Sequence, residues 1–564
     1  MTPSTISALR SERERRRFIV PALMVAALLF APAAQAQDAS SAFGEVIDVR
    51  VVNLEVVVTE KGERVTGLGP DDFELLVDKE PVPIEYFTEV SGGTAVARDP
   101  DGSSATLSAL APGEAVGTSY LVFVDDFFTL ERDRNKVLDS LIAQLPNLQP
   151  HDSMAVVAYD GKSVEMLSNW SANVPSLTRA LKEAQRRKAR GLERIAERRI
   201  FDSRREFNAT QDQDPNNILG DLSTFISIEE EQMASKISGQ VKNAVRAATA
   251  TLRGFANPPG RRVMMLLSGG WPSDPVRWAV SEDEGFFEAR GIQRGDELLD
   301  ELADTANRLS YTIYPVDLPG VTYEGIDASI GSVDTSEIAR VATQVREREE
   351  ERSLLQLAAE TGGTAMLNSV RLAAFERTVS DTRSYYWLGF TPSWQGNDTQ
   401  HKVEVRVKRP GVKIRTRDSY SDLSRSTEVS MMVESALLFG EAPGAGPLDI
   451  EVGRGKRAGI GRRDVPLKVS VPLHEVTFLP VAKGFSTQLE LRIAVLDSDG
   501  NRAEEIPVIP FGYEAPRAPK ADEIAFVPFE TKLRMRNKRH TLVVSVYDVA
   551  SGKILTGRAE ILKK

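Results

Sequence analysis

The stretch SYLVFVD at residues 119–125 decides the fold class that the sequence predicts. It is a continuous apolar run of strand length, which is typical of a strand buried on both faces of a parallel sheet. Segments with helical apolar spacing separate it from comparable runs further along the chain. Those runs lie at residues 153–160, 261–270, 311–317, 364–368 and 385–392. The alternation predicts an α/β fold with a doubly wound, mostly parallel, Rossmann-like sheet.

All-β segments flank this predicted domain. Residues 44–90 contain stretches in which apolar and polar residues alternate, as in half-buried strands. Residues 402–417 alternate in the same way around a Pro-Gly turn and predict a β-hairpin. Because the N-terminal segment is small for an independent fold, we expect residues 44–90 and 402–420 to pair into one β-sandwich. About six short strands after residue 448 predict a second sandwich.

The fold class is therefore expected to be α/β plus all-β, with the domain boundaries as follows. We expect a signal peptide at 1–36, an N-terminal β domain at 37–92 that residues 400–420 could complete, a linker at 93–116, the α/β domain at 117–395 with a helical insertion at 182–260, a β-hairpin at 396–420, a linker at 421–447 and a C-terminal β-sandwich at 448–564.

The insertion at residues 182–260 is polar, and its first part is rich in Arg. The interleaved Glu193, Glu197 and Glu206 favour a solvated, salt-bridged helix face, while a surface for an acidic partner is the alternative. The run REREEER at residues 346–352 predicts the exposed start of another helix.

The N-terminus predicts export. A basic cluster precedes the apolar run at residues 18–30, and Ala34 and Ala36 occupy the small-residue positions of a signal-peptide cleavage site. A transmembrane anchor is the alternative, but the run is shorter than the ~20 residues of a span and contains Pro21. We expect cleavage near Ala36, no transmembrane span in the mature chain, and a periplasmic or extracellular location in a bacterium.

Composition excludes several classes of chemistry. The chain has 564 residues, a net charge of −11, no Cys and four His. The acidic balance disfavours nucleic-acid binding, and the absence of Cys removes thiolate catalysis and Cys-ligated metals. The sequence also lacks a G-x-S-x-G elbow, a P-loop and a G-x-G-x-x-G motif. We therefore expect no enzymatic activity.

Several segments in this order resemble a known family. They are VIDVRVVNLEVVVTEKGERVTGLGPDDFELLVD, LVFVDDFF, GRRVMMLLSGG, YTIYPVD, LAAETGGTA, TRSYYWLGFTP and KVEVRVKRPGVKIRTRDSY. The succession is similar to that of bacterial secreted proteins related to the von Willebrand factor type A (VWFA) domain, over residues 44–420. The resemblance implies a Rossmann-like VWFA domain flanked by β-sandwiches, and a non-enzymatic role.

The resemblance also implies a possible metal site. VWFA domains often hold a divalent cation through D-x-S-x-S, a Thr in a second loop and a later Asp, and Mg²⁺ favours such an oxygen cage. Here Asp125 and Thr129 match the ends of the motif, Phe127 replaces its middle Ser, and Gly269 stands where the later Asp is expected. The candidate metal ligands are Asp125, Asp126 and Thr129. The alternative is that the two carboxylates cap the turn after the strand.

These observations favour one function over two others. The first is a secreted or periplasmic scaffold that binds a protein partner of unknown identity, through the strand-end loops and the insertion. The alternatives are a cation-dependent adhesin that uses Mg²⁺ or another divalent cation and, with less support, a hydrolase. No other cofactor and no nucleic-acid partner is expected.

Overall fold

A computed structural model of the chain describes residues 51–96, 110–211, 226–255, 258–281, 291–318, 337–439, 446–498, 506–518 and 525–562. The predicted signal peptide at 1–36 and its cleavage site lie outside these residues. So does most of the predicted linker at 93–116.

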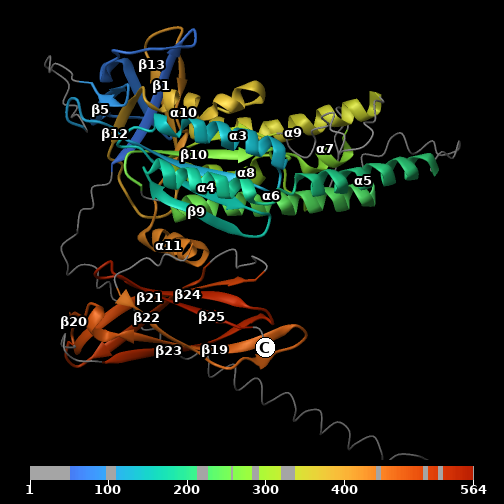
Figure 1. Cartoon of the computed structure of the whole chain (residues 1–564). Coiled ribbons are helices and arrows are strands. Elements are labelled where there is room, and N and C mark those ends of the chain that lie inside the picture. Colours follow the sequence, from blue (N-terminus) through green and yellow to red (C-terminus); the bar gives the residue numbers. More distant parts are fainter. Residues whose placement is uncertain are drawn as a thin grey trace, which may run out of the picture. The chain divides into compact units, whose positions relative to one another are not determined.

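One sheet of five strands has helices on both faces (Figure 1). Its order is β11-β10-β7-β8-β9, in which the first four strands are parallel and β9 is antiparallel to β8. The strands are β7 (Thr118–Asp125), β8 (Ser153–Tyr159), β9 (Val164–Ser171), β10 (Arg261–Ser268) and β11 (Tyr311–Asp317).

Alternate residues of β7 face the two helical layers, because successive side chains of a strand point to opposite faces. Tyr120 and Val122 join the core on one face, and Leu121 and Phe123 join the core on the other. The first face is covered by α3 (Glu131–Gln144), α4 (Val174–Arg186) and α10 (Ala374–Thr382). The second is covered by α6 (Ile228–Gly254), α8 (Asp296–Arg308) and part of α9 (Glu337–Thr361). The remaining helices here are α5 (Gly191–Gln211) and α7 (Pro275–Val280).

Two antiparallel sheets, which we call the β layer, share a second core that includes Leu54, Phe73 and Tyr386. Their orders are β14-β1-β12-β5-β6, with β2 beside β1, and β15-β13-β3-β4. The strands are β1 (Val52–Glu60), β2 (Glu63–Arg64), β3 (Phe73–Val77), β4 (Glu80–Val82), β5 (Tyr86–Ser91), β6 (Thr94–Ala95), β12 (Tyr385–Phe390), β13 (Gln400–Val407), β14 (Lys413–Arg415) and β15 (Ser419–Ser421).

The β layer is assembled from two segments, residues 52–95 and 385–421, that almost 300 residues of chain separate. Val58 of β1 pairs with Ile414 of β14, and Leu75 of β3 pairs with Val405 of β13. The pairing expected between residues 44–90 and 402–420 is therefore present, and the chain between these segments contains the five-stranded sheet.

The C-terminal part forms two facing antiparallel sheets around Val469, Leu491 and Val544. The first consists of β16 (Gly446–Pro447), β20 (Leu479–Val481), β21 (Gly484–Asp497), β22 (Val508–Ala515), β24 (His540–Asp548) and β25 (Ile554–Ile561). The second consists of β17 (Asp449–Val452), β18 (Lys456–Arg457), β19 (Arg462–Pro472) and β23 (Phe526–Arg536).

The segment predicted as a linker at 421–447 contains α11 (Arg425–Phe439), which contacts both α6 and the C-terminal strands β21 and β24. Val429 and Val433 pack with Val543 of β24. On the other side, Glu434 accepts a hydrogen bond from Arg253 of α6 at 2.6 Å. Helix α11 is thus a packed element between two cores.

The predicted fold class is wrong for this chain. It placed a doubly wound, mostly parallel sheet of VWFA type at the centre of the architecture. Sixteen of the twenty pairings between described strands are antiparallel. Four of the five sheets are antiparallel apart from one two-residue pairing, that of β16 with β25. The architecture is predominantly antiparallel and sandwich-like.

Strand β12 shows the physical reason for this error. Its sequence YYWLGF is a continuous apolar run, the pattern that predicts a parallel strand of the α/β domain. It is instead the central strand of the β layer and pairs antiparallel with β1 and β5. Its two faces contribute to different apolar clusters, Tyr386 to one and Tyr385 to the other. An apolar run reports burial of both faces, and it carries no information on strand direction.

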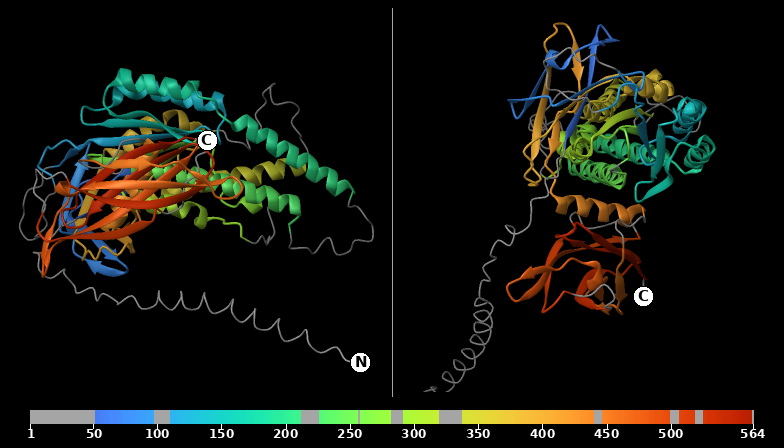
Figure 2. Two further views of the ribbon diagram at one scale, coloured as in Figure 1. Left: turned by 90° about the horizontal axis from the view of Figure 1, so that it is seen from below. Right: turned by 90° about the vertical axis from the view of Figure 1, so that its left-hand side faces the viewer.

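Two helices are more deeply buried than their polar sequences indicate. Val241, Ala244 and Ala248 of α6 belong to the core on one face of the five-stranded sheet, so α6 is part of the fold although it lies within the expected insertion at 182–260. In α9, Glu349 and Glu350 are buried within the helix, although residues 346–352 were expected to form an exposed helix start. Figure 2 shows α5 and α6 running side by side beyond the sheet.

We expect the β layer to depend on the interior of β12. Replacing the fully buried Leu388 with Ala leaves a cavity in the core that the two sheets of the β layer share and should lower the free energy of unfolding by about 2–5 kcal/mol. Urea denaturation followed by circular dichroism measures the change. Leu355→Ala, at a half-exposed position of α9, is the matched control and should change stability by less than ~0.5 kcal/mol. Equal effects of the two substitutions would contradict this account of β12.

Candidate functional site

Asp125 is the last residue of β7 and is completely buried. One carboxylate oxygen accepts hydrogen bonds from the backbone N–H groups of Phe127 (2.9 Å) and Phe128 (3.2 Å). The other accepts from Ser268 Oγ at the end of β10 (2.7 Å) and from Trp271 Nε1 (2.9 Å). Four protein donors therefore surround this carboxylate.

Burial raises the pKa of Asp125 to about 6, because the ionised form loses its hydration. The hydrogen bonds from Trp271, Ser268 and the two backbone N–H groups oppose this shift but do not cancel it. Asp125 therefore titrates close to neutral pH.

Asp126 is buried beside two guanidinium groups. One oxygen accepts from Arg134 of α3, whose side chain is also completely buried, and the other accepts from Arg187 Nε at 2.8 Å, just after α4. Arg134 also donates to the carbonyl oxygens of Gln185 (3.0 Å) and Arg187 (2.9 Å). The backbone N–H of Asp126 donates to Tyr159 at the end of β8. The carboxylate thus joins α3 to the C-terminus of α4.

Thr129 completes this group, which we call the strand-end cluster and define as Asp125, Asp126, Thr129, Arg134 and Arg187. The Thr129 hydroxyl donates to the backbone carbonyl of Asp125 at 2.6 Å, and its side chain is buried. The three residues singled out from the sequence therefore lie together.

Helices cover the carboxyl ends of the strands at this point. The N–H of Gly191, the first residue of α5, donates to the carbonyl of Thr129 at 3.0 Å. A Cβ at Gly191 would lie 2.4 Å from that oxygen, so the close approach of α5 requires Gly. Gly270 is similarly pressed against the backbone of Glu350 in α9, at a φ of +83°. The cluster is sealed beneath α5 and α9.

The donor set does not fit a divalent cation. Mg²⁺ needs free oxygen ligands in a near-octahedral cage. The oxygens of Asp125 already accept four hydrogen bonds, and those of Asp126 face two arginines that supply the compensating positive charge. Phe127 offers no oxygen, and its ring lies under the guanidinium of Arg194 at 4.6 Å. In the part of the chain that the structure describes, no group of three or more Asp, Glu or His could hold a metal ion. The contacts of Asp125 match the alternative in which a carboxylate caps the turn, whereas the carboxylate of Asp126 pairs with Arg134 and Arg187.

Sequence reasoning missed four partners of these carboxylates. Ser268 and Trp271 lie in the stretch LLSGGW. Only their position at the end of a buried strand could have indicated that they contact the carboxylates. Arg134 and Arg187 are two of 70 basic residues, and nothing in their spacing distinguishes them.

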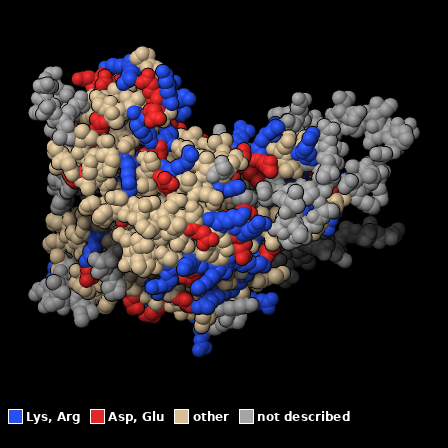
Figure 3. All heavy atoms as spheres, turned by 45° about the horizontal axis from the view of Figure 1, so that its top comes forward, with Lys and Arg blue, Asp and Glu red and all other residues tan. Residues whose placement is uncertain are grey.

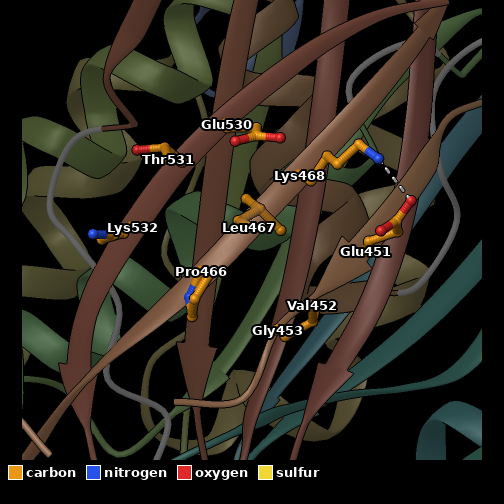
Figure 4. A pocket seen from close by; sticks show the side chains of 9 residues that line it. All are labelled: Glu451, Val452, Gly453, Pro466, Leu467, Lys468, Glu530, Thr531 and Lys532. Atoms are coloured by element: carbon orange, nitrogen blue, oxygen red, sulfur yellow. Dashed lines mark hydrogen bonds and ion pairs between the residues drawn. The ribbon is translucent and has the colours of Figure 1, made fainter. Parts of the chain in front are cut away.

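A second candidate is an open hollow of about 650 Å³ on the outer face of β17, β19 and β23 (Figure 4). Glu451, Lys468 and Glu530 form one cross-strand row on it, and Lys468 binds Glu451 at 3.2 Å. Pro466 and Gly453 line the adjacent row. Because these charges are exposed and alternate in sign, they describe a solvated sheet face rather than a ligand site.

Comparisons with known proteins leave the family open. No protein-family model and no curated protein matches the chain. Among solved structures, the PilB minor pilin from Streptococcus sanguinis is 9% identical, with a TM-score of 0.23, and the match covers 60% of this chain and 87% of the pilin. The pilus adhesin SpaC from Lactobacillus rhamnosus GG is 8% identical, with a TM-score of 0.24, and the match covers 79% of this chain and 56% of the adhesin. Likenesses at this level do not establish a shared fold.

Among the described helices, none combines the length and the apolar character that crossing a membrane requires.

We expect the ion pairs of Asp126 to be essential for stability. Asp126→Ala leaves the buried Arg134 without its carboxylate and should lower the free energy of unfolding by about 3–5 kcal/mol. Asp133→Ala, whose exposed partner is Lys136, is the control and should cost less than ~1 kcal/mol. The double variant Asp126→Leu/Arg134→Met removes both charges and should recover part of the loss. Chemical denaturation measures all three, and an Asp126→Ala loss no larger than the control would refute the buried pairing.

The raised pKa of Asp125 predicts a pH dependence of stability. Because the folded protein holds this proton up to about pH 6 and the unfolded chain releases it near pH 4, stability should fall as pH rises between these values. The contribution is on the order of 3 kcal/mol. Asp125→Asn cannot titrate, so the difference in unfolding free energy between wild type and variant should shift by this amount between pH 4 and pH 6.5. A constant difference across this range would show that the pKa of Asp125 is not raised.

Proposed function

We propose that this chain is an exported, non-enzymatic binding protein that holds a protein partner on the outer face of α5. The observation that carries the proposal is an exposed apolar stripe formed by Leu192, Ala196 and Ile200. These residues are spaced four apart, so they lie along one face of the helix.

The exposure of this stripe is high for apolar side chains. Leu192 is 56% exposed and Ile200 is 55% exposed, whereas Ile195 and Phe201 on the inner side of the same helix are buried. Exposed apolar residues that line up on one surface, bordered by polar groups, are typical of protein interaction sites. A helix of the partner that carries apolar residues at the same four-residue spacing could pack against this stripe and bury it.

The charges around the stripe favour an acidic partner. Residues 186–205 contain nine Lys or Arg and three Asp or Glu. Some of these charges are paired, as in Arg194–Glu197 and Lys188–Glu193, in keeping with the salt-bridged face expected from the sequence. The exposed side chains of Arg186 and Arg204 add to the excess of positive charge. On α4, Arg179 and Lys182 continue it, and Figure 3 shows Lys and Arg gathered across one face of the molecule.

Contacts with its neighbours hold α5 in place before a partner arrives. Asp202 binds Arg346 of α9 through two hydrogen bonds of 2.6 and 2.9 Å. Glu197 binds Lys236 of α6 at 2.9 Å, and Arg205 donates to the carbonyl of Val280 in α7. A surface that is ordered in the free protein loses less conformational entropy on binding.

The alternatives have less support. A cation-dependent adhesin requires an accessible metal site, whereas the strand-end cluster is buried and its carboxylates are paired with protein donors. A hydrolase requires a nucleophile and a base in reach of each other, and the sequence offers no such pattern. Export rests on the predicted leader at residues 1–36, and the resemblance to VWFA-related proteins stays a prediction.

The proposal is tested with immobilised mature chain and envelope extract of the source cells. Wild-type protein should retain a partner that moderate salt releases, since cations border the stripe. Leu192→Glu/Ile200→Glu should lose that partner, because it places carboxylates opposite an acidic surface. Leu355→Glu, at a half-exposed position of α9, is the matched control and should retain it.

The sign of the introduced charge makes the test specific. Leu192→Lys/Ile200→Lys removes the same apolar area but should weaken retention at least ten-fold less than the Glu pair. Equal retention by wild type and the Glu variant would exclude α5 as the contact. Equal losses with Lys and Glu would contradict the acidic character of the partner.

A further inference from the structure

A pocket of about 330 Å³ lies within the β layer, far along the chain from the strand-end cluster. It is lined by the end of β12 and the following loop, the turn between β3 and β4, β13 and β15. The residues that matter here are Asp78, Phe390, Trp394, His401, Tyr420 and Asp422. Its volume is at the lower end of the ~300–1,000 Å³ of small-molecule sites.

Aromatic rings form one wall of this pocket around Tyr420. The ring of His401 stacks on Tyr420, with centroids 5.0 Å apart and an interplanar angle of 21°. Phe390 and Trp394 meet Tyr420 edge to face, at 5.6 and 5.9 Å. The contacts hold the four rings in a fixed arrangement and leave a rigid apolar surface at the pocket.

The side chain of Tyr420 is largely buried, but its hydroxyl has no acceptor among the described residues and is not one of the buried unpartnered atoms, so it is open to the pocket. The residue is only 6% exposed, and its hydroxyl forms no hydrogen bond with any residue that the structure describes. Burial, together with the charges of Asp78 and Asp422, raises the pKa of Tyr420 to about 12. The hydroxyl therefore keeps its proton at physiological pH, and a ligand oxygen in the pocket could accept it.

Carboxylates supply fixed acceptors beside this donor. Asp78 accepts from the N–H of Lys402 (2.9 Å) and contacts His401 Nδ1 (2.7 Å), and this pairing with His401 lowers the pKa of Asp78. Asp422 accepts from the N–H groups of Gln395 (2.6 Å) and Gly396 (2.9 Å). Each carboxylate has about four acceptor positions, so both can accept further hydrogen bonds.

We infer that this pocket binds a neutral pyranose ring of a sugar. A sugar hydroxyl both donates and accepts, so it can accept from Tyr420 while neighbouring hydroxyls donate to Asp78 and Asp422. The C–H face of the ring packs against the aromatic wall. The residues that line the pocket include no Lys or Arg, which disfavours phosphate and other anions. A quaternary ammonium would suit the rings and the negative charge, but it offers no acceptor to the Tyr420 hydroxyl.

Isothermal titration of the mature chain with neutral methyl glycosides tests the inference. The probes are the methyl glycosides of glucose, galactose, mannose and N-acetylglucosamine, with glucose 6-phosphate and tetramethylammonium as charged comparators. At least one neutral glycoside should bind saturably and at least ten-fold more tightly than either charged compound. Absence of saturable binding by all four at millimolar concentration, or preferential binding of tetramethylammonium, would overturn the inference.

Tyr420→Phe is the decisive variant. It removes only the hydroxyl, which has no protein partner to lose, so the thermal midpoint should stay unchanged. Affinity for the sugar should fall at least ten-fold, because a site built to bind a hydroxyl strongly favours the ligand that completes it. Tyr513→Phe, on β22 of the C-terminal sandwich, is the matched control and should bind as wild type does. Trp394→Leu should weaken binding by loss of ring surface, and unchanged affinity in both pocket variants would refute the site.

Discussion

The burial of two adjacent carboxylates at the end of β7 is the constraint on which the strand ends depend. Removing an ion from water costs several kcal/mol unless donors or counter-ions replace the lost hydration. For Asp125 and Asp126 the replacements come from α3, the end of α4, the end of β10 and Trp271. Their contacts with the two carboxylates hold all of these segments at the carboxyl end of β7. Helix α5 begins there too, since Gly191 donates to Thr129. These ion pairs and hydrogen bonds offset the cost of burying the charges, and they also order the surrounding segments.

The sequence located most strands but could not assign their partners. Apolar runs mark β7, β8, β10 and β11, because strands covered on both sides carry few polar residues. The same signal marks β12, whose neighbours β1 and β5 come from the start of the chain. Pairing depends on which edges meet in three dimensions, so a local pattern could not distinguish an antiparallel layer from a parallel sheet. The pairing of residues 44–90 with 402–420 could be predicted, because both segments show an alternating apolar pattern. Each has an apolar face to bury, and neither is large enough to form a core alone.

The candidate residues were visible in the sequence, but their surroundings were not. Adjacent Asp residues directly after a buried strand pointed to a site, and Asp125, Asp126 and Thr129 do lie together. Whether a cation or a guanidinium neutralises Asp126 depends on Arg134 and Arg187, which are eight and sixty-one residues from it. The pocket in the β layer left no signal at all. Asp78, Trp394 and Tyr420 belong to separate strands and loops, and only the long-range pairing of β3 with β13 brings them to one place.

In the function that we propose, sealing the strand ends places recognition on the outside of the helices that seal them. The inner side of α5 closes over Thr129 at Gly191, where no side chain fits. The next residue, Leu192, is already exposed and begins the apolar stripe. The inner face of α5 closes the strand ends, and the backbone hydrogen bonds of Arg190 to Asp126 and of Gly191 to Thr129 that hold the start of the helix also hold its exposed face in position. The strand-end cluster could admit solvent or a metal ion only if α5 moved away from it. An accessible strand-end site therefore excludes a fixed apolar stripe on the outer face of α5. The contacts of Arg134, Arg187 and Gly191 favour the second.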